Sequence, residues 1–118
     1  MKKILVAEDF EVLSKLIRNA LKGVEAQLME AYDGAEALKM ALAEKPDLII
    51  MDMDMPKMTG FDVTRSLRAK PEFAATPILM LTATGDERSA RDAGVTAFMY
   101  KPYSPAKLRE KVQELLDH

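Results

Sequence analysis

The stretch LIIMDMDMPKMTG, residues 48–60, decides the fold class. Its first four residues are all apolar, which is typical of a strand covered on both faces of a parallel sheet. Asp52 and Asp54 follow directly. This pair of carboxylates fits a metal site, a nucleophile with an acid/base partner, or the polar edge of a buried strand, and the rest of the chain has to decide among the three.

Short apolar runs like this one recur along the chain, at residues 4–7, 27–31, 48–51, 78–81 and 97–100. The segments between them have helical periodicity. Alternating strands and helices require right-handed crossovers and a parallel sheet with helices on both faces. We therefore expect an α/β, doubly wound, flavodoxin-like fold of five (βα) units, with strand order 2-1-3-4-5, in one domain over residues 1–118.

The helices are expected from their apolar faces and end signals. The first has an apolar arc that Val12 and Leu21 make wider than a core face needs. The fourth, near residues 85–93, is the least apolar, and the fifth should begin with Ser104 at its N-cap and Pro105 in its first turn.

Composition removes several classes of function. A chain of 118 residues with 48% hydrophobic and 31% charged content is long enough to form a core without disulfide or metal cross-links. Its net charge of −2 does not indicate a basic surface for direct nucleic-acid binding. There is no cysteine, and the single histidine is the terminal His118, so thiolate and imidazole catalysis are not expected. No apolar stretch approaches spanning length. We expect a cytoplasmic protein with no membrane insertion.

The ends of the predicted strands carry the chemistry. In a doubly wound sheet, ligands lie beyond the carboxyl ends of the strands where strand order switches. The residues there are Glu8, Asp9, Asp52, Thr82 and Lys101. Three clustered carboxylates repel one another, and a hard divalent cation such as Mg²⁺ relieves that repulsion. Lysine and threonine can bind phosphoryl oxygens, and an aspartate beside the metal can take the phosphoryl group as a nucleophile.

These residues resemble the receiver domain of two-component response regulators. The resemblance is carried by ED at 8–9, DMDMPKMTG at 52–60, LTA at 81–83 and KP at 101–102, and it spans essentially the whole chain. It implies that Asp52 is the phosphoacceptor and that Lys101–Pro102 is a cis bond. It implies an Mg²⁺ site formed by Asp9 and Asp52 directly, Glu8 through water, and the backbone carbonyl of Asp54.

The resemblance also implies a switch. Asp52 would receive its phosphoryl group from a phosphohistidine on a sensor histidine kinase or phosphotransfer protein, Thr82 and Lys101 would bind the phosphoryl oxygens, and Thr82 and Phe98 would move together. Asp54 and Thr84 are candidates for setting the lifetime of the acyl phosphate. Such a protein is not a conventional enzyme, although self-phosphorylation from a donor and slow self-dephosphorylation are expected.

Two partner surfaces are expected. The fourth helix, fifth strand and fifth helix would form the readout face for a downstream protein effector, with Arg91 and Tyr100 exposed on it. Phe10 and Val12 would be partly exposed and would help to dock the kinase. The protein itself is expected to be a monomer or a weak dimer.

Two other functions compete with the switch. The DMD motif, residues 52–54, also resembles the nucleophile motif of haloacid-dehalogenase-like phosphatases, but Glu8 and Asp9 precede the nucleophile and no acidic pair follows Lys101 at a strand end. A non-phosphorylated receiver-like binding module is the second alternative, and the complete set of residues argues against it. The dispersed glycines form no phosphate-binding loop.

Overall fold

The computed structural model describes residues 1–83 and 85–117. Five parallel strands lie in the order β2-β1-β3-β4-β5, as the sequence predicts. In chain order, the elements are β1 (Lys2–Ala7), α1 (Glu11–Ala20), β2 (Ala26–Ala31), α2 (Gly34–Glu44), β3 (Leu48–Asp52), α3 (Gly60–Arg68), the 3₁₀-helix η1 (Pro71–Phe73), β4 (Ile78–Thr82), α4 (Glu87–Ala93), β5 (Ala97–Tyr100) and α5 (Pro105–Leu116).

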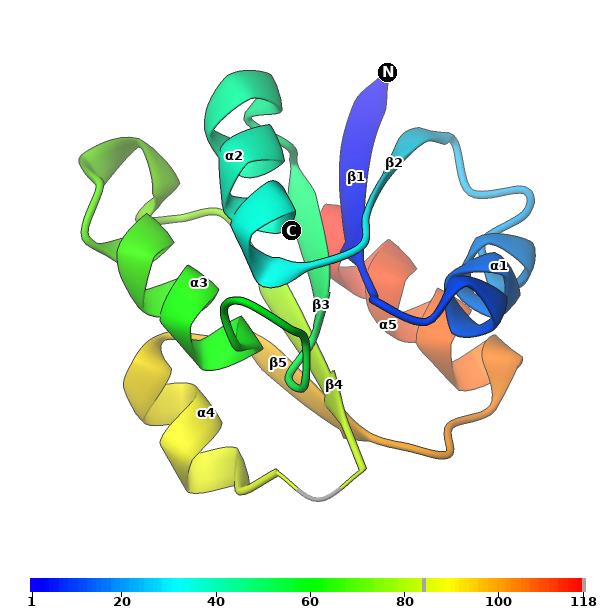
Figure 1. The fold of residues 1–118 in the computed structure, drawn as a ribbon. Coiled ribbons are helices and arrows are strands. Elements are labelled where there is room, and N and C mark those ends of the chain that lie inside the picture. The colour runs from blue at the N-terminus through cyan, green and yellow to red at the C-terminus, as the bar shows by residue number, and fades with distance from the viewer. Residues whose placement is uncertain (84, 118) are drawn as a thin grey trace.

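The sheet divides the core into two layers, and Figure 1 shows α1 and α5 on one face and α2, α3 and α4 on the other. Side chains of one strand alternate between the two faces. Leu5, Ile49 and Met80 therefore pack with the layer of α2, α3 and α4. Val6 and Ile50 pack with the layer of α1 and α5. Because β3 and β4 are buried along their whole length, continuous apolar runs were needed there.

Local signals start the helices where the sequence places them. The side chain of Ser104 accepts a hydrogen bond from the amide of Lys107, and Pro105 begins α5, so both predictions are confirmed. Asp33 caps α2 by accepting from the amide of Glu36 at 2.7 Å. Thr59 and Asp62 form a reciprocal capping box at the start of α3.

Element boundaries differ slightly from the expectation. The strand β1 begins at Lys2 and β2 at Ala26, while α4 begins only at Glu87 because Asp86 forms its N-cap. The short 3₁₀-helix η1 was not predicted. Among residues 1–83 and 85–117, no helix is long and apolar enough to cross a membrane.

The helix α1 leaves apolar side chains uncovered. Ile17 is buried, whereas Val12 and Leu16 are 56% and 55% exposed, and Phe10 at the N-cap is 57% exposed. The wide apolar arc of this helix is therefore larger than the face that packs on the sheet, as the sequence indicated.

Candidate functional site

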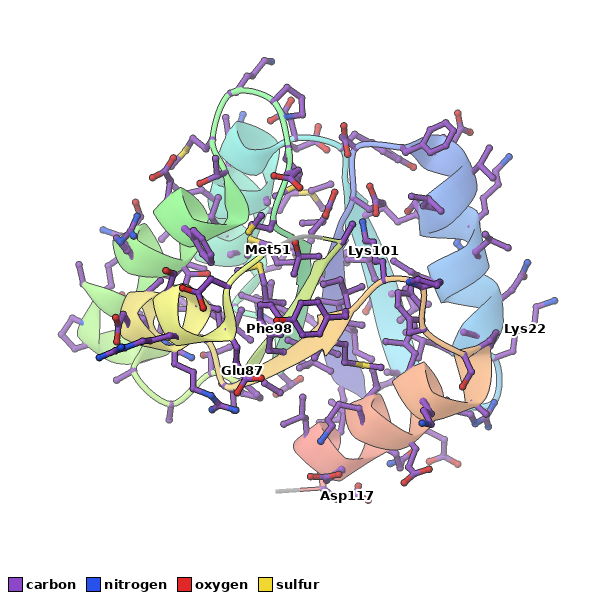
Figure 2. All side chains as sticks on the ribbon, turned by 90° about the horizontal axis from the view of Figure 1, so that it is seen from below. Lys22, Met51, Glu87, Phe98, Lys101 and Asp117 are labelled. Carbon is purple, nitrogen blue, oxygen red and sulfur yellow. The ribbon has the colours of Figure 1, made fainter. Side chains whose placement is uncertain are left out.

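The predicted site residues meet at the carboxyl edge of the sheet. The strand β1 ends just before Glu8, β3 ends at Asp52, β4 ends at Thr82, and β5 ends just before Lys101. Since all of these strands run parallel, their ends reach the same edge. In Figure 2, Lys101 lies at the end of β5, and Phe98 lies farther back on the same strand.

Three carboxylates cluster at this edge. Glu8, Asp9 and Asp52 each offer an oxygen, and these oxygens all lie within 4.8 Å of one another. Glu8 and Asp52 are buried, with 1% and 5% exposure, whereas Asp9 is exposed. Hard oxygen donors that are close together and open to solvent on one side are the ligand set that Mg²⁺ prefers. The residues present therefore fit a magnesium ion.

Lys101 joins two of the carboxylates. Its Nζ donates to Asp52 Oδ1 at 3.0 Å and to Glu8 Oε1 at 3.4 Å. The amide of Lys101 donates to the carbonyl of Thr82 at 2.7 Å. The Lys101–Pro102 bond is cis, as the sequence resemblance implies. Burial lowers the pKa of Lys101, but the hydrogen bond and charge of Asp52, with those of Glu8, raise it more. The ammonium group stays charged.

Burial dominates the titration of Glu8. Desolvation raises the pKa of its carboxyl to about 7, assisted by the charge of Asp52, although a hydrogen bond from the backbone amide of Phe10 and the charge of Lys101 act in the opposite direction. That amide donates to Glu8 Oε2 at 3.2 Å. Burial beside a second carboxyl favours the neutral form of Glu8, and a divalent cation that enters the cluster would favour the charged form.

The hydroxyl of Thr82 is held by the chain that follows it. Thr82 is fully buried, and its Oγ1 accepts from the amide of Gly85 at 2.8 Å and lies 3.8 Å from Met53 Sδ.

Phe98 is half-buried and makes an edge-to-face contact with Tyr100, with ring centroids 4.9 Å apart. Thr84, the second candidate for setting the acyl-phosphate lifetime, lies outside the described residues.

The loop from Met53 to Thr59 carries Asp54. The amide of Asp54 donates to Asp52 Oδ1 at 3.4 Å, and its own side chain is exposed. The amide of Gly60 closes the loop by donating to the carbonyl of Met53 at 2.9 Å. A Cβ at Gly60 would lie 2.7 Å from the carbonyl oxygen of Asp52, so the loop returns too close to β3 for a side chain there.

An apolar cavity of about 620 Å³ opens beside the site, and sequence reasoning did not anticipate it. Leu13, Leu16 and Ala20 of α1 line one side, and Lys101 and Tyr103 line another. Burial raises the pKa of the Tyr103 hydroxyl. The surplus apolar arc of α1 was the only sequence signal for this cavity, because the segment opposite α1 is distant along the chain.

Comparison with known proteins agrees with this geometry. Residues 4–113 match the family described as the response regulator receiver domain. The chain is 39% identical to the alkaline phosphatase synthesis transcriptional regulatory protein PhoP of Bacillus subtilis, with 98% of this chain matched and 48% of PhoP, so it spans about half the length of that relative. It is 34% identical to the chemotaxis protein CheY of Pseudomonas aeruginosa, with 98% of this chain and 96% of CheY matched.

Solved structures show the same fold. The chemotaxis response regulator CheY4 of Vibrio cholerae superposes with a TM-score of 0.90 at 31% identity over 98% of both chains. The receiver domain of the sensor histidine kinase PA1611 of Pseudomonas aeruginosa, solved with a magnesium ion coordinated in its active site cleft, gives a TM-score of 0.90 at 29% identity over 99% of this chain and 98% of that chain. Fold, site and relatives agree, and the chain belongs to the response regulator receiver domain family of two-component signalling.

Proposed function

We propose that this receiver domain is a switch that accepts a phosphoryl group on Asp52 in the presence of Mg²⁺. One observation carries the proposal: Lys101 Nζ contacts Asp52 at 3.0 Å and Glu8 at 3.4 Å, within a carboxylate cluster that includes Asp9. A fixed cation beside a nucleophilic carboxylate and a set of hard oxygen ligands is an arrangement suited to phosphoryl transfer.

The transfer step follows from ordinary phosphoryl chemistry. A carboxylate oxygen of Asp52 attacks the phosphorus of a phosphohistidine, the P–N bond breaks, and the imidazole leaves and takes up a proton. Lys101 and Thr82 donate to the phosphoryl oxygens. Asp9, Asp52, the Asp54 carbonyl and Glu8 through water would hold Mg²⁺, which would add to the positive charge that Lys101 already supplies beside the three acids.

The readout depends on a movement of the Thr82 hydroxyl. In the described structure Thr82 Oγ1 accepts from the amide of Gly85 at 2.8 Å. A phosphoryl group on Asp52 would draw the hydroxyl toward itself as a hydrogen-bond donor, and Phe98 would turn into the space that Thr82 leaves. We propose that α4, β5 and α5 display this change to a protein effector, with Tyr100 and Arg91 exposed on that face.

The donor is proposed to dock beside α1. Phe10 and Val12 are more than half exposed, and Leu13 and Leu16 of the same helical segment line the cavity that Lys101 also lines. Exposed apolar side chains grouped beside a reactive centre are suited to a protein partner, here a sensor histidine kinase or a phosphotransfer protein. We expect the protein to act in the cytoplasm, where the ATP that feeds a phosphohistidine is available, as a monomer or a weak dimer.

The direct test is intact mass spectrometry after incubation with Mg²⁺ and acetyl phosphate. One added phosphoryl group is expected on the wild type and none on Asp52→Asn, which removes the nucleophilic oxygen but keeps the shape. Chelation of Mg²⁺ should abolish the addition. A wild type that gains no mass under conditions that preserve acyl phosphates would overturn the proposal.

A further inference from the structure

The N-terminus of α2 lies directly against the loop that carries Asp54. The amide of Gly34, the first residue of this helix, donates to the carbonyl of Pro56 at 3.3 Å. A helix's first amides have no acceptor within the helix itself. The loop therefore supplies a partner that α2 lacks, and α2 in turn fixes the loop.

Asp33 strengthens this contact with both of its oxygens. Its Oδ1 accepts from the amide of Glu36 and caps the helix, and its Oδ2 lies 3.3 Å from Nζ of Lys57 in the loop. One carboxylate thus ties the helix end to the loop.

The loop backbone is strained where it meets the helix. Lys57 has φ +72°, and the amide of Met58 donates to the carbonyl of Pro56 at 2.9 Å, an i to i+2 bond around Lys57. A γ-turn with positive φ is rare for a residue with a side chain and persists only when its surroundings hold it. The contacts made by Asp33 and Gly34 are such surroundings.

Gly34 is required for space and not for its backbone angles. Its φ is not in the left-handed region, so alanine could adopt the same conformation. However, a Cβ there would overlap the carbonyl oxygen of Met58 and lie 2.7 Å from Met58 Cβ. Any side chain at position 34 has to push residues 56–58 away from the helix.

We propose that Gly34 and Asp33 are positioning residues for the metal site: they seat the loop of residues 53–59 so that the Asp54 carbonyl faces the carboxylate cluster. The inference rests on the proposed function, because it uses Asp54 as a metal ligand. Only Met55 separates Asp54 from Pro56 in the chain, so we expect a shift of Pro56 to move the Asp54 carbonyl as well.

The test compares Mg²⁺ affinity, measured by NMR titration of the unphosphorylated protein, in wild type, Gly34→Ala and Ala43→Gly. Relieving a steric overlap of this kind typically costs a free energy that corresponds to about a tenfold change in an equilibrium constant. Gly34→Ala should weaken Mg²⁺ binding about tenfold while its amide spectrum remains that of a folded protein. Ala43 is exposed near the other end of α2, so Ala43→Gly should lower helix stability without changing Mg²⁺ affinity. Equal Mg²⁺ affinity in wild type and folded Gly34→Ala overturns the inference.

A second measurement needs no variant and decides the question if Gly34→Ala does not fold. Because coupling between two sites is reciprocal, Mg²⁺ should raise the protection of the Gly34 amide against hydrogen exchange. Protection of Gly34 that is the same with and without saturating Mg²⁺ overturns the inference. If the wild type binds no Mg²⁺ and accepts no phosphoryl group, the proposed function fails instead, so the two failures are distinguishable.

Discussion

Glu8 makes the stability of the metal-free protein depend on pH. Its pKa is raised to about 7, chiefly by burial, so the folded state binds this proton more tightly than the unfolded chain does. The resulting stabilisation is complete below the ordinary pKa of a glutamic acid and is lost as the pH rises through 7. Between pH 5 and 7, Glu8 alone should lower the free energy of unfolding by about 2 kcal/mol.

Urea unfolding in the presence of a chelator measures this dependence. Glu8→Gln keeps the oxygen that accepts from the Phe10 amide but cannot ionise, and its unfolding free energy should fall less over the same pH range. Identical pH slopes in the two proteins would contradict the assignment of a raised pKa to Glu8. Glu110→Gln on the exposed side of α5 is a matched control and should leave the slope unchanged.

Lys101 and a divalent cation compete for the same carboxylate oxygens. Lys101→Met keeps the length of the side chain and removes the charge that contacts Asp52 and Glu8. Mg²⁺ should then bind severalfold more tightly, because no ammonium group has to be displaced from the cluster, whereas phosphorylation by acetyl phosphate should slow at least tenfold. Isothermal titration and mass spectrometry measure the two effects.

The opposite directions of these two effects distinguish a specific role of Lys101 from a general loss of structure. A general loss of structure would weaken Mg²⁺ binding and phosphorylation together. Lys107→Met, on the exposed side of α5, should change neither. Weaker Mg²⁺ binding in Lys101→Met would mean that the lysine supports the metal site and does not compete with it.

Residues that end parallel strands could be found from sequence, whereas residues that act through backbone contacts could not. Glu8, Asp52, Thr82 and Lys101 each follow an apolar run, and parallel strands bring their ends together. Gly34 has no such signal. Its importance comes from the carbonyl of Met58 lying against it, and a pattern of residue types does not record which backbone atoms meet.

One face of α1 packs on the sheet, and another face exposes apolar side chains to solvent. Ile17 anchors it to the sheet, and Phe10, Val12 and Leu16 remain exposed. The double variant Phe10→Ala, Val12→Ala should slow phosphoryl transfer from a phosphohistidine protein at least severalfold, because docking surface is lost. Its rate with acetyl phosphate should not change, since a small donor needs no docking. Rapid-quench transfer assays measure both rates.

The control for this prediction is Leu42→Ala on α2. Leu42 is also an exposed apolar residue, at 38%, but it lies in the helical layer on the opposite face of the sheet. It should leave both rates unchanged. An unchanged transfer rate in the double variant would remove Phe10 and Val12 from the docking surface.

The start of α5 was predicted correctly from its cap residue, whereas the start of α4 was not. Ser104 marks the start of α5, and its hydroxyl does bind the helix amide. The helix α4 was expected near residue 85, but Asp86 accepts from the amide of Arg88 and delays the helix to Glu87. The 3₁₀-helix at Pro71–Phe73 was not predicted, because it depends on the buried position of Phe73 and on the short connection to β4. Both are properties of the tertiary structure that the local sequence does not show.

At the scale of the whole molecule, a phosphoryl mimic should reveal how far the change at Asp52 spreads. Adding beryllofluoride and Mg²⁺ should shift the NMR signals of Thr82, Phe98, Tyr100 and the residues of α4. Signals at the end of α2 near Ala43 should remain in place. Asp52→Asn should show none of the shifts. Shifts confined to the carboxylate cluster would contradict a readout through α4 and β5.

The sheet that separates the two core layers also separates the surface proposed to bind the kinase from the contact proposed to position the metal loop. The surface proposed for the kinase belongs to α1 and its layer, while the seat of the metal loop is in the layer of α2 and α3. Substitutions more than about 7–10 Å apart with no shared neighbours usually have additive effects on stability. A lineage could therefore exchange one donor for another by altering exposed side chains of α1, and the contact between α2 and the metal loop, on the far side of the sheet, would be inherited intact.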